Sequence, residues 1–267
     1  MRIVVPIKQV PETSAVKMDP ETGTMVRDGV EAIVNPLDLY AIEVALEIRD
    51  ARDDGSEVIA LTMGPPAARK AIGEAISMGA DSGVLVSDRA LAGADTWSTS
   101  YVLAAAIKKI GDFDLIVCGE RATDGDTGQV GPGIAAFLDL PIATYISKID
   151  CSGEMSCTLD RLVEDGCEHL EMKLPAAVTV VKAIASPRLP TLGGKQRSRK
   201  IDIPVWGAAD LDVESENLGL AGSPTRVVKI FRPQVTRECE KLPAGDSDTV
   251  ETAADRVIEF LTEAELI

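Results

Sequence analysis

Histidine, aromatic residues and positive charge are all scarce in this chain of 267 residues. A Ser-His-Asp catalytic site would have to use the single histidine, His169, which we instead expect at the surface of an acidic, strand-like stretch. Aromatic residues make up 3%, too few for the stacking surface of a single-strand nucleic-acid binder. The 27 basic and 43 acidic residues give a net charge of −16, which argues against nucleic acid or an anionic membrane as partner. A bound nucleotide is not excluded, because backbone N–H groups can hold a phosphate locally.

Signals for export, membrane insertion and metal binding are also missing. Lys8 interrupts the apolar N-terminal run after five residues, so the segment does not resemble a signal peptide. No apolar run approaches the roughly 18 residues that a membrane span needs. The odd number of cysteines and the lack of C-x-x-C spacing favour free thiols over disulfides or a zinc site. We therefore expect a cytoplasmic protein with no metal and with free thiols at Cys118, Cys151, Cys157, Cys167 and Cys239.

Short β-branched runs alternate with helical patterns over the first half of the chain. The runs are typical of strands buried on both faces, and they are Ile3–Pro6, Glu57–Met63, Gly83–Val86 and Leu115–Cys118. Helical spacing follows Asn35-Pro36, which we expect to cap a helix, and follows Pro65-Pro66. Two further helices are predicted at Trp97–Ile110 and Thr127–Leu138. This alternation predicts an α/β fold with a doubly wound, mostly parallel, Rossmann-like sheet and a C-terminal arm.

The sequence divides into three parts. Residues 1–185 form the α/β nucleotide-binding domain, with a hairpin excursion expected over Val16–Val34. Residues 186–232 show little periodicity and are predicted to be an irregular extension. Residues 233–267 form a linker and a helical arm, with an apolar stripe and a capping box of Asp248 and Glu251. From the pattern alone, the arm docks either on a partner or on its own core.

The segment from Cys118 to Pro132 is the strongest candidate for ligand binding. It joins a buried strand to a helix, and ligands of open α/β sheets lie beyond such strand ends. Gly125 and Gly128 permit close approach of the backbone, and Thr127 is expected to cap the helix. The N–H groups of residues 127–129 would then form an anion site, unless the segment is only a Gly/Asp-rich surface loop. We expect the carboxylates of residues 124 and 126 to turn toward backbone N–H groups or ribose hydroxyls, away from phosphate.

Other segments reach the same predicted edge of the sheet. Val5–Lys8, Thr62–Pro66, Ser87–Arg89 and Gly93–Thr96 follow predicted strands, and Asn35–Asp38 is placed less firmly. Each segment alone is also compatible with a simple connection. A single groove that they all line suits an elongated dinucleotide such as FAD better than a mononucleotide.

A basic run at residues 195–200 follows a Pro/Gly-rich stretch that presents Leu189 and Leu192 on a predicted loop. Exposed apolar anchors with a charged rim are typical of a transient docking site. A solvated charged face is the other interpretation.

Several motifs together resemble the electron transfer flavoprotein beta subunit, over nearly the whole chain. The motifs are Arg2–Val5 with Lys8, Arg27–Val30, Asn35-Pro36, Met63–Pro65, Asp124–Gln129, Arg161, Glu164–Gly166, Glu168 and Leu174–Ala176. In the family, this subunit holds either AMP as a structural ligand or a second FAD that takes a hydride from NADH and splits its two electrons. The chain is similar to the second, bifurcating kind through Met63–Pro66, Ser87–Arg89, Gly93–Thr96, Asp124–Pro132 and Ser223–Thr225. It departs from that kind at Glu120-Arg121, Thr123 and Gly128.

The resemblance implies a cofactor site and a set of partners. The implied cofactor-binding residues are Pro6, Lys8, Asn35, Asp38, Met63, Gly64, Asp95, Thr96, Arg121, Ala122, Thr123, Asp124, Gly125, Asp126, Thr127, Gly128 and Gln129. Leu192, with Lys195 and Arg197, would dock an acyl-CoA dehydrogenase-type partner, and the C-terminal helix would bind the alpha subunit. NADH would be the electron donor and ferredoxin or flavodoxin the low-potential acceptor. The alternatives are a non-bifurcating subunit with AMP and a stand-alone nucleotide-hydrolysing protein.

Overall fold

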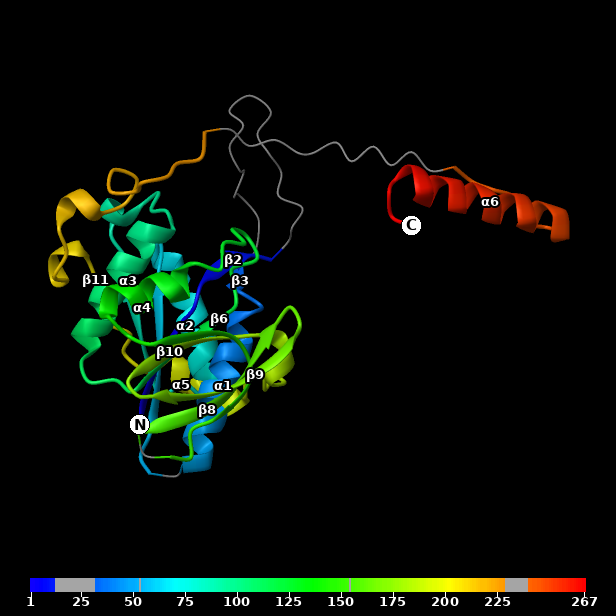
Figure 1. The fold of residues 1–267 in the computed structure, drawn as a ribbon. Coiled ribbons are helices and arrows are strands. Elements are labelled where there is room, and N and C mark those ends of the chain that lie inside the picture. Colours follow the sequence, from blue (N-terminus) through cyan, green and yellow to red (C-terminus); the bar gives the residue numbers. More distant parts are fainter. Residues whose placement is uncertain (13–31, 53, 154, 229–239) are drawn as a thin grey trace. The chain divides into compact units, whose positions relative to one another are not determined.

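The computed structural model describes residues 1–12, 32–52, 54–153, 155–228 and 240–267. These residues belong to two compact units, Met1–Val228 and Lys229–Ile267, which are described separately. The first unit holds the sheet and also residues 186–228, and the second holds one long helix (Figure 1).

A nine-stranded sheet runs through the first unit. Its order is β11 (Val205–Trp206), β5 (Ser82–Val86), β4 (Glu57–Met63), β1 (Arg2–Pro6), β6 (Leu115–Gly119), β10 (Ala176–Val180), β7 (Ile142–Asp150), β8 (Ser156–Val163) and β9 (Gly166–Lys173). Neighbouring strands from β11 to β7 pair in parallel, whereas β8 and β9 extend the sheet antiparallel. Chain connections run from β1 toward β4 and β5 on one side, and from β6 toward β7 and β10 on the other. The strand order therefore reverses between β1 and β6.

Helices cover both faces of this sheet (Figure 1). The helices α1 (Asp38–Arg52) and α2 (Arg69–Met78) contribute to one apolar core, and α3 (Thr96–Ile110) and α4 (Val130–Leu138) to a second. Within β1, Ile3 and Val5 belong to the first core and Val4 to the second, because side chains alternate along a strand. The predicted doubly wound fold is confirmed.

Two short strands leave the sheet at the predicted excursion. β2 (Gln9–Pro11) pairs antiparallel with β3 (Ala32–Val34). The turn expected between them, and most of the segment Val16–Val34, lies outside the described residues. Two 3-10 turns, Pro66–Ala68 and Arg89–Leu91, follow β4 and β5.

The segment after β10 is more regular than its composition predicts. It contains 3-10 turns at Lys182–Ile184, Ala208–Asp210 and Ser215–Asn217, and the helix α5 (Leu192–Ser198). The prediction of a loop that presents Leu189 and Leu192 was therefore wrong for Leu192, which begins α5, whereas Leu189 lies in the irregular segment before it. Tertiary contacts hold α5 despite its two glycines, since the Thr191 N–H donates to the Ser77 carbonyl at 3.1 Å and its hydroxyl caps the helix at the Gly194 N–H.

Cys151 and Cys157 form a disulfide, which contradicts the prediction that all five cysteines are free thiols. The β7–β8 hairpin brings their Cα atoms to 4.3 Å, at the short limit of the usual disulfide separation, although the sequence spacing shows no motif. Of the other described cysteines, Cys118 is a buried thiol and Cys167 an exposed one.

The second unit contains α6 (Ser247–Glu263). Asp246 caps this helix by accepting from the Thr249 N–H at 2.9 Å, while Thr249 Oγ1 accepts from the Asp246 N–H at 3.1 Å. The predicted capping pair of Asp248 and Glu251 was wrong, because the cap position is held by Asp246 and the helix begins at Ser247. Among the described residues, no helix combines the length and apolar character that a bilayer span requires.

Candidate functional site

Loops that follow four parallel strands share one edge of the sheet. β4 and β6 flank β1 and run in its direction, and β5 lies beyond β4. The segments after these strands therefore lie at the same edge, as the sequence predicts. Because the strand order reverses between β1 and β6, a crevice is expected outside their carboxyl ends.

Asn35 joins the start of α1 to the loop after β6. Its side-chain N–H groups donate to Asp38 Oδ1 and to the Arg121 carbonyl, each at 2.9 Å, and its Oδ1 accepts from the Thr123 N–H at 3.1 Å. The side chain is buried and fully used in these bonds. The helix begins at Asp38, so the prediction that Asn35 caps it was wrong. Asn35 instead fixes the position of the candidate loop.

Asp38 is a buried carboxyl group beneath this loop. Its Oδ2 accepts from the Lys8 N–H at 2.7 Å, and its Oδ1 accepts from Asn35. Burial raises its pKa to about 7, and the hydrogen bonds from Asn35 and Lys8 oppose that rise. Gly119, the last residue of β6, leaves room for Asp38 Oδ1, which a β-carbon at that position would overlap. Pro6, at the end of β1, is buried beside Lys8.

Residues 121–129 form a tight turn before α4. The N–H groups of Gly125 and Asp126 both point to the Ala122 carbonyl, at 3.3 and 2.7 Å. Gly128 has a φ of 63°, in the left-handed region, so the helix cannot include it and begins at Val130. The prediction that Thr127 caps the helix was therefore wrong, and Gln129 holds the cap position without a side-chain bond.

A run of backbone N–H groups at this point has no acceptor among the described residues. Residues 127–131 donate no hydrogen bond to any residue that the structure describes. The run includes the three N–H groups expected from the sequence and continues into the first turn of α4. Unengaged N–H groups at a helix N-terminus attract anions, and the helix dipole adds to that attraction.

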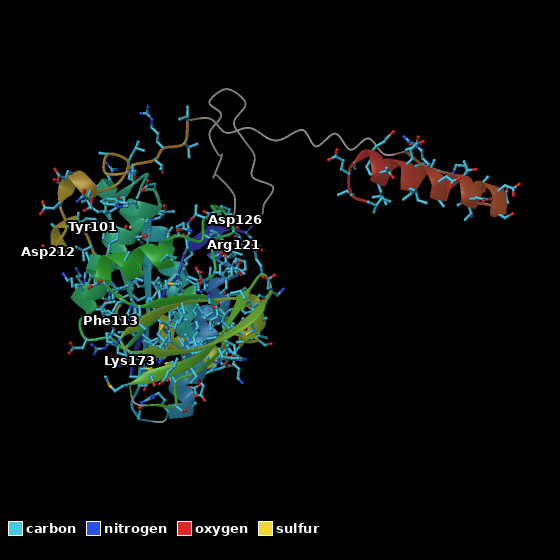
Figure 2. The ribbon with its side chains drawn as sticks, in the orientation of Figure 1. Tyr101, Phe113, Arg121, Asp126, Lys173 and Asp212 are labelled. Atoms are coloured by element: carbon cyan, nitrogen blue, oxygen red, sulfur yellow. A yellow bond between two sulfur atoms is a disulfide. The ribbon has the colours of Figure 1, made fainter. Side chains whose placement is uncertain are left out.

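The two carboxylates of the loop form ion pairs. Asp124 Oδ1 lies 2.7 Å from Lys8 Nζ, and Asp126 Oδ1 lies 3.0 Å from Arg121 Nε. Figure 2 shows Arg121 and Asp126 close together on the loop. Neither carboxylate accepts from a backbone N–H of the described residues, so the expectation of backbone partners was wrong, while a contact with ribose hydroxyls stays a prediction. A full positive charge within 3 Å attracts a carboxylate more strongly than an N–H dipole does.

The end of β4 carries a buried polar atom within the predicted edge segment Thr62–Pro66. The Gly64 N–H donates to the Val86 carbonyl at 3.0 Å, which ties the Met63-Gly64 turn to β5. Next to this turn, Thr62 is fully buried, and its hydroxyl has no partner among the described residues. A threonine inside the apolar run EVIALTM was the signal available in the sequence.

Asp95 has an internal structural role. Its Oδ1 caps α3 at the Ser98 N–H at 3.0 Å, and its Oδ2 accepts from the N–H and hydroxyl of Thr225 at 2.9 and 2.8 Å. Burial alone would raise the pKa of Asp95, but these hydrogen bonds outweigh it and lower the pKa. The carboxylate thereby fastens Thr225 to the start of α3, and the Asp95 N–H donates to Ser223 Oγ at 2.8 Å. A cofactor contact at Asp95 or Thr96 stays a prediction.

The three implied docking residues lie on α5, but their side chains do not all point to solvent. Leu192 is 75% exposed, and Lys195 lies one turn farther along on the same face. Arg197 turns toward α2 and donates to the Ile76 and Ala80 carbonyls. Of the three side chains, Leu192 and Lys195 therefore point away from α2, and Arg197 points toward it.

Two hollows lie away from the loop edge. One, of about 440 Å³, is lined by α1 and the β7–β8 turn. The other, also about 440 Å³, lies beside Tyr101 and Phe137, which stack edge-to-face with a centroid distance of 5.5 Å. Neither is lined by residues 121–129, so we place the site by the strand ends and the free N–H groups.

The residues at this edge fit an extended, phosphate-containing ligand. Five consecutive free N–H groups and the Lys8 ammonium group can bind phosphate oxygens, and the buried Thr62 hydroxyl is left unpaired by the described residues. Around Gly125, a β-carbon would meet no atom within 4 Å, so the loop surface is open there. A doubly wound sheet with main-chain donors at the strand-order reversal is typical of nucleotide-binding α/β proteins.

Comparisons with known proteins narrow this class. A family model described as "Electron transfer flavoprotein domain" matches residues 22–211. "Caffeyl-CoA reductase-Etf complex subunit CarD" of Acetobacterium woodii is 43% identical over 267 residues, covering 100% of both chains. "Electron transfer flavoprotein subunit beta" of Thermoanaerobacterium thermosaccharolyticum is 42% identical over 258 residues, 96% of this chain and 98% of the relative. "Protein FixA" of Azorhizobium caulinodans is 42% identical over 246 residues, 89% of this chain and 86% of the relative. The chain belongs to the electron transfer flavoprotein family, as a beta subunit.

Proposed function

We propose that the loop edge binds FAD and that the chain works in an electron-bifurcating heterodimer. The observation that carries the proposal is the run of five free N–H groups at residues 127–131, beside the strand-order reversal. A diphosphate bridge offers more oxygens to such a run than the single phosphate of AMP. The FAD, when bound, would supply hydride acceptance from NADH and transfer of single electrons.

The chain's own residues would bind and orient the cofactor. The N–H groups of residues 127–131 would hold the diphosphate, and Lys8 would add one positive charge after releasing Asp124. Asn35 would keep the loop in place through its bonds to Arg121 and Thr123. Hydride transfer needs no general acid or base from the protein, which agrees with a site without histidine.

The partners follow from the same proposal. We infer that α6 binds the alpha subunit, whose own FAD receives one electron and passes it to an acyl-CoA dehydrogenase-type partner bound at Leu192 and Lys195. The second electron would go to ferredoxin or flavodoxin. The relative CarD is named for a caffeyl-CoA reductase-Etf complex, which supports a dehydrogenase-type partner for this chain. A cytoplasmic location belongs to the same proposal.

Cofactor stoichiometry tests the proposal directly. The chain is co-expressed with its alpha subunit, the purified heterodimer is denatured, and the released FAD and AMP are quantified. Two FAD per heterodimer and no AMP are expected, and NADH should bleach flavin absorbance. One FAD with one AMP would overturn the proposal and favour the non-bifurcating alternative.

A variant tests whether the second FAD binds at this site. Asn35→Ala removes the ties between α1 and the loop, so the heterodimer should lose one of its two FAD molecules. Gly73→Ala, in α2 and outside the implied cofactor-binding residues, adds a β-carbon that meets no atom within 4 Å, and it should retain both. Full FAD content in Asn35→Ala would contradict the assignment of the site.

A further inference from the structure

A carboxylate, a thiol and an imidazole meet on one face of the β8–β9 hairpin. In the strand register, Asp160 lies opposite His169, and Leu162 lies opposite Cys167. Side chains two residues apart in a strand share a face, so Asp160, Cys167 and His169 project to the same side. Their ligand atoms all lie within 4.8 Å of one another. In the described parts of the chain, no other group of three histidine, cysteine or acidic side chains meets this criterion.

All three groups are accessible to an incoming ion. The His169 side chain is 81% exposed and the Asp160 side chain 29%, and Cys167 is an exposed thiol. His169 Nδ1 lies 2.7 Å from Asp160 Oδ1, so the imidazole is already oriented toward the carboxylate. The chain's single histidine and an exposed thiol thus converge through strand pairing, at positions that carry no metal-binding spacing in the sequence.

We propose that Asp160, Cys167 and His169 bind a zinc ion. Calcium and magnesium prefer oxygen donors throughout, whereas zinc takes sulfur, nitrogen and carboxylate oxygen together. Three protein ligands and one water complete the tetrahedral coordination of an open zinc site. Binding replaces the thiol proton with zinc, and the proton passes to solvent.

The charges and geometry of the β8–β9 hairpin are compatible with a bound zinc ion. The carboxylate and the thiolate together neutralise the two charges of the ion. Lys148 lies opposite Asp160 on the other neighbouring strand and opposes a cation, while Glu171 on the His169 face of β9 favours one. Zinc ligands lie about 3.5 Å apart, so the carboxylate and imidazole need to separate by only about 1 Å. Exposed side chains can make that change while the paired strands stay in place.

Zinc content of the whole heterodimer tests the proposal. The protein, with its alpha subunit and flavin, is dialysed against zinc chloride with a competing chelator, and bound zinc is measured by mass spectrometry. Cys167→Ser and His169→Ala should each weaken zinc binding at least about tenfold. Glu168→Gln is the matched control, because Glu168 lies between the two ligands in sequence but pairs with Arg161 on the opposite face. Cys239→Ser tests a cysteine outside the described residues, and it should retain zinc.

Equal zinc binding by the wild type, Cys167→Ser and His169→Ala would overturn the proposal, as would an equal loss in Glu168→Gln. X-ray absorption at the zinc edge gives a readout that needs no variant. One sulfur and one imidazole nitrogen in the coordination shell are expected, and a shell of oxygen atoms alone would contradict the site. Thermal unfolding and flavin content of the variants should match the wild type, because the side chains are exposed.

Discussion

Gly119 and Asp38 are packed so closely that no side chain fits at position 119. A β-carbon there would overlap Asp38 Oδ1 and approach the Leu37 carbonyl carbon and oxygen to 3.0 Å. This contact sets the separation between the end of β6 and the start of α1, and with it the position of the candidate loop.

Gly119→Ala should therefore destabilise the protein. Overpacking costs about 1–3 kcal/mol, so we expect a fall of that size in the free energy of unfolding, measured by urea denaturation. Gly125→Ala, with no atom within 4 Å of its new β-carbon, should change stability by less than about 0.5 kcal/mol. Similar stabilities for the two variants would refute this account of Gly119.

The buried Asp38 carboxyl group should make stability depend on pH. Burial raises its pKa to about 7, whereas an unfolded aspartate titrates near 3.9. Between these values the folded protein holds a proton that the unfolded chain has lost, so this group's contribution to stability falls as pH rises from about 4 to 7. The slope is at most about 1.4 kcal/mol per pH unit. Urea unfolding of the wild type and Asp38→Asn across this range should show the slope only in the wild type, and parallel curves would contradict it.

Asp124 should weaken the binding of a phosphate-containing ligand. It neutralises Lys8 at 2.7 Å, and removing its charge is worth on the order of 1 kcal/mol to a phosphate nearby. Asp124→Asn should therefore bind FAD about fivefold more tightly in equilibrium dialysis at low salt, and the gain should shrink at high salt. Asp139→Asn makes the same charge change at the far end of α4 and should leave affinity unchanged. Equal affinities for the two variants would show that Asp124 does not face the ligand.

Substitutions of Leu192 and Arg197 should have different effects, the first on partner docking and the second on stability. Arg197→Met removes two hydrogen bonds from a charged donor, one to Ile76 in α2 and one to Ala80 just after it, so the free energy of unfolding should fall by about 1–3 kcal/mol. Leu192→Ala removes an exposed side chain, so stability should change little while the KM for the partner dehydrogenase rises. Unchanged steady-state kinetics with the dehydrogenase in Leu192→Ala would remove this residue from the docking surface.

The apolar stripe of α6 should be required for assembly with the alpha subunit. Val250, Val257 and Ile258 are each at least half exposed within this helix, and no residue of α6 is buried. Ile258→Asp should therefore reduce the heterodimer fraction in size-exclusion chromatography. Thr252→Asp adds the same charge on the opposite side of the helix and should leave assembly intact. If both variants assemble normally, the stripe has another role.

Local patterns predicted the regular part of the fold correctly. β-branched runs located β1, β4, β5 and β6 to within a few residues, because strands buried on both faces must be continuously apolar. The helix α5 was missed because its sequence, LGGKQRS, has low helix propensity. Its stability comes from contacts with α2, which lies over 100 residues earlier.

The candidate site was predicted only in part, again because contacts between residues distant in the sequence determine it. Strand ends identified the loops, but the partners of the side chains depend on tertiary contacts. Asn35 bonds to Arg121, 86 residues away, and Lys8 pairs with Asp124, 116 residues away. No local pattern encodes such pairs, or the strand pairing that brings His169 to Asp160.

The anchoring of α5 has a consequence for any protein that binds at Leu192. The helix is already folded and fastened to α2 through Thr191 and Arg197 before a partner arrives. Binding there would sacrifice little conformational entropy, so even a small contact could be specific and still dissociate quickly. Rapid exchange between successive partners is what a protein that shuttles electrons requires.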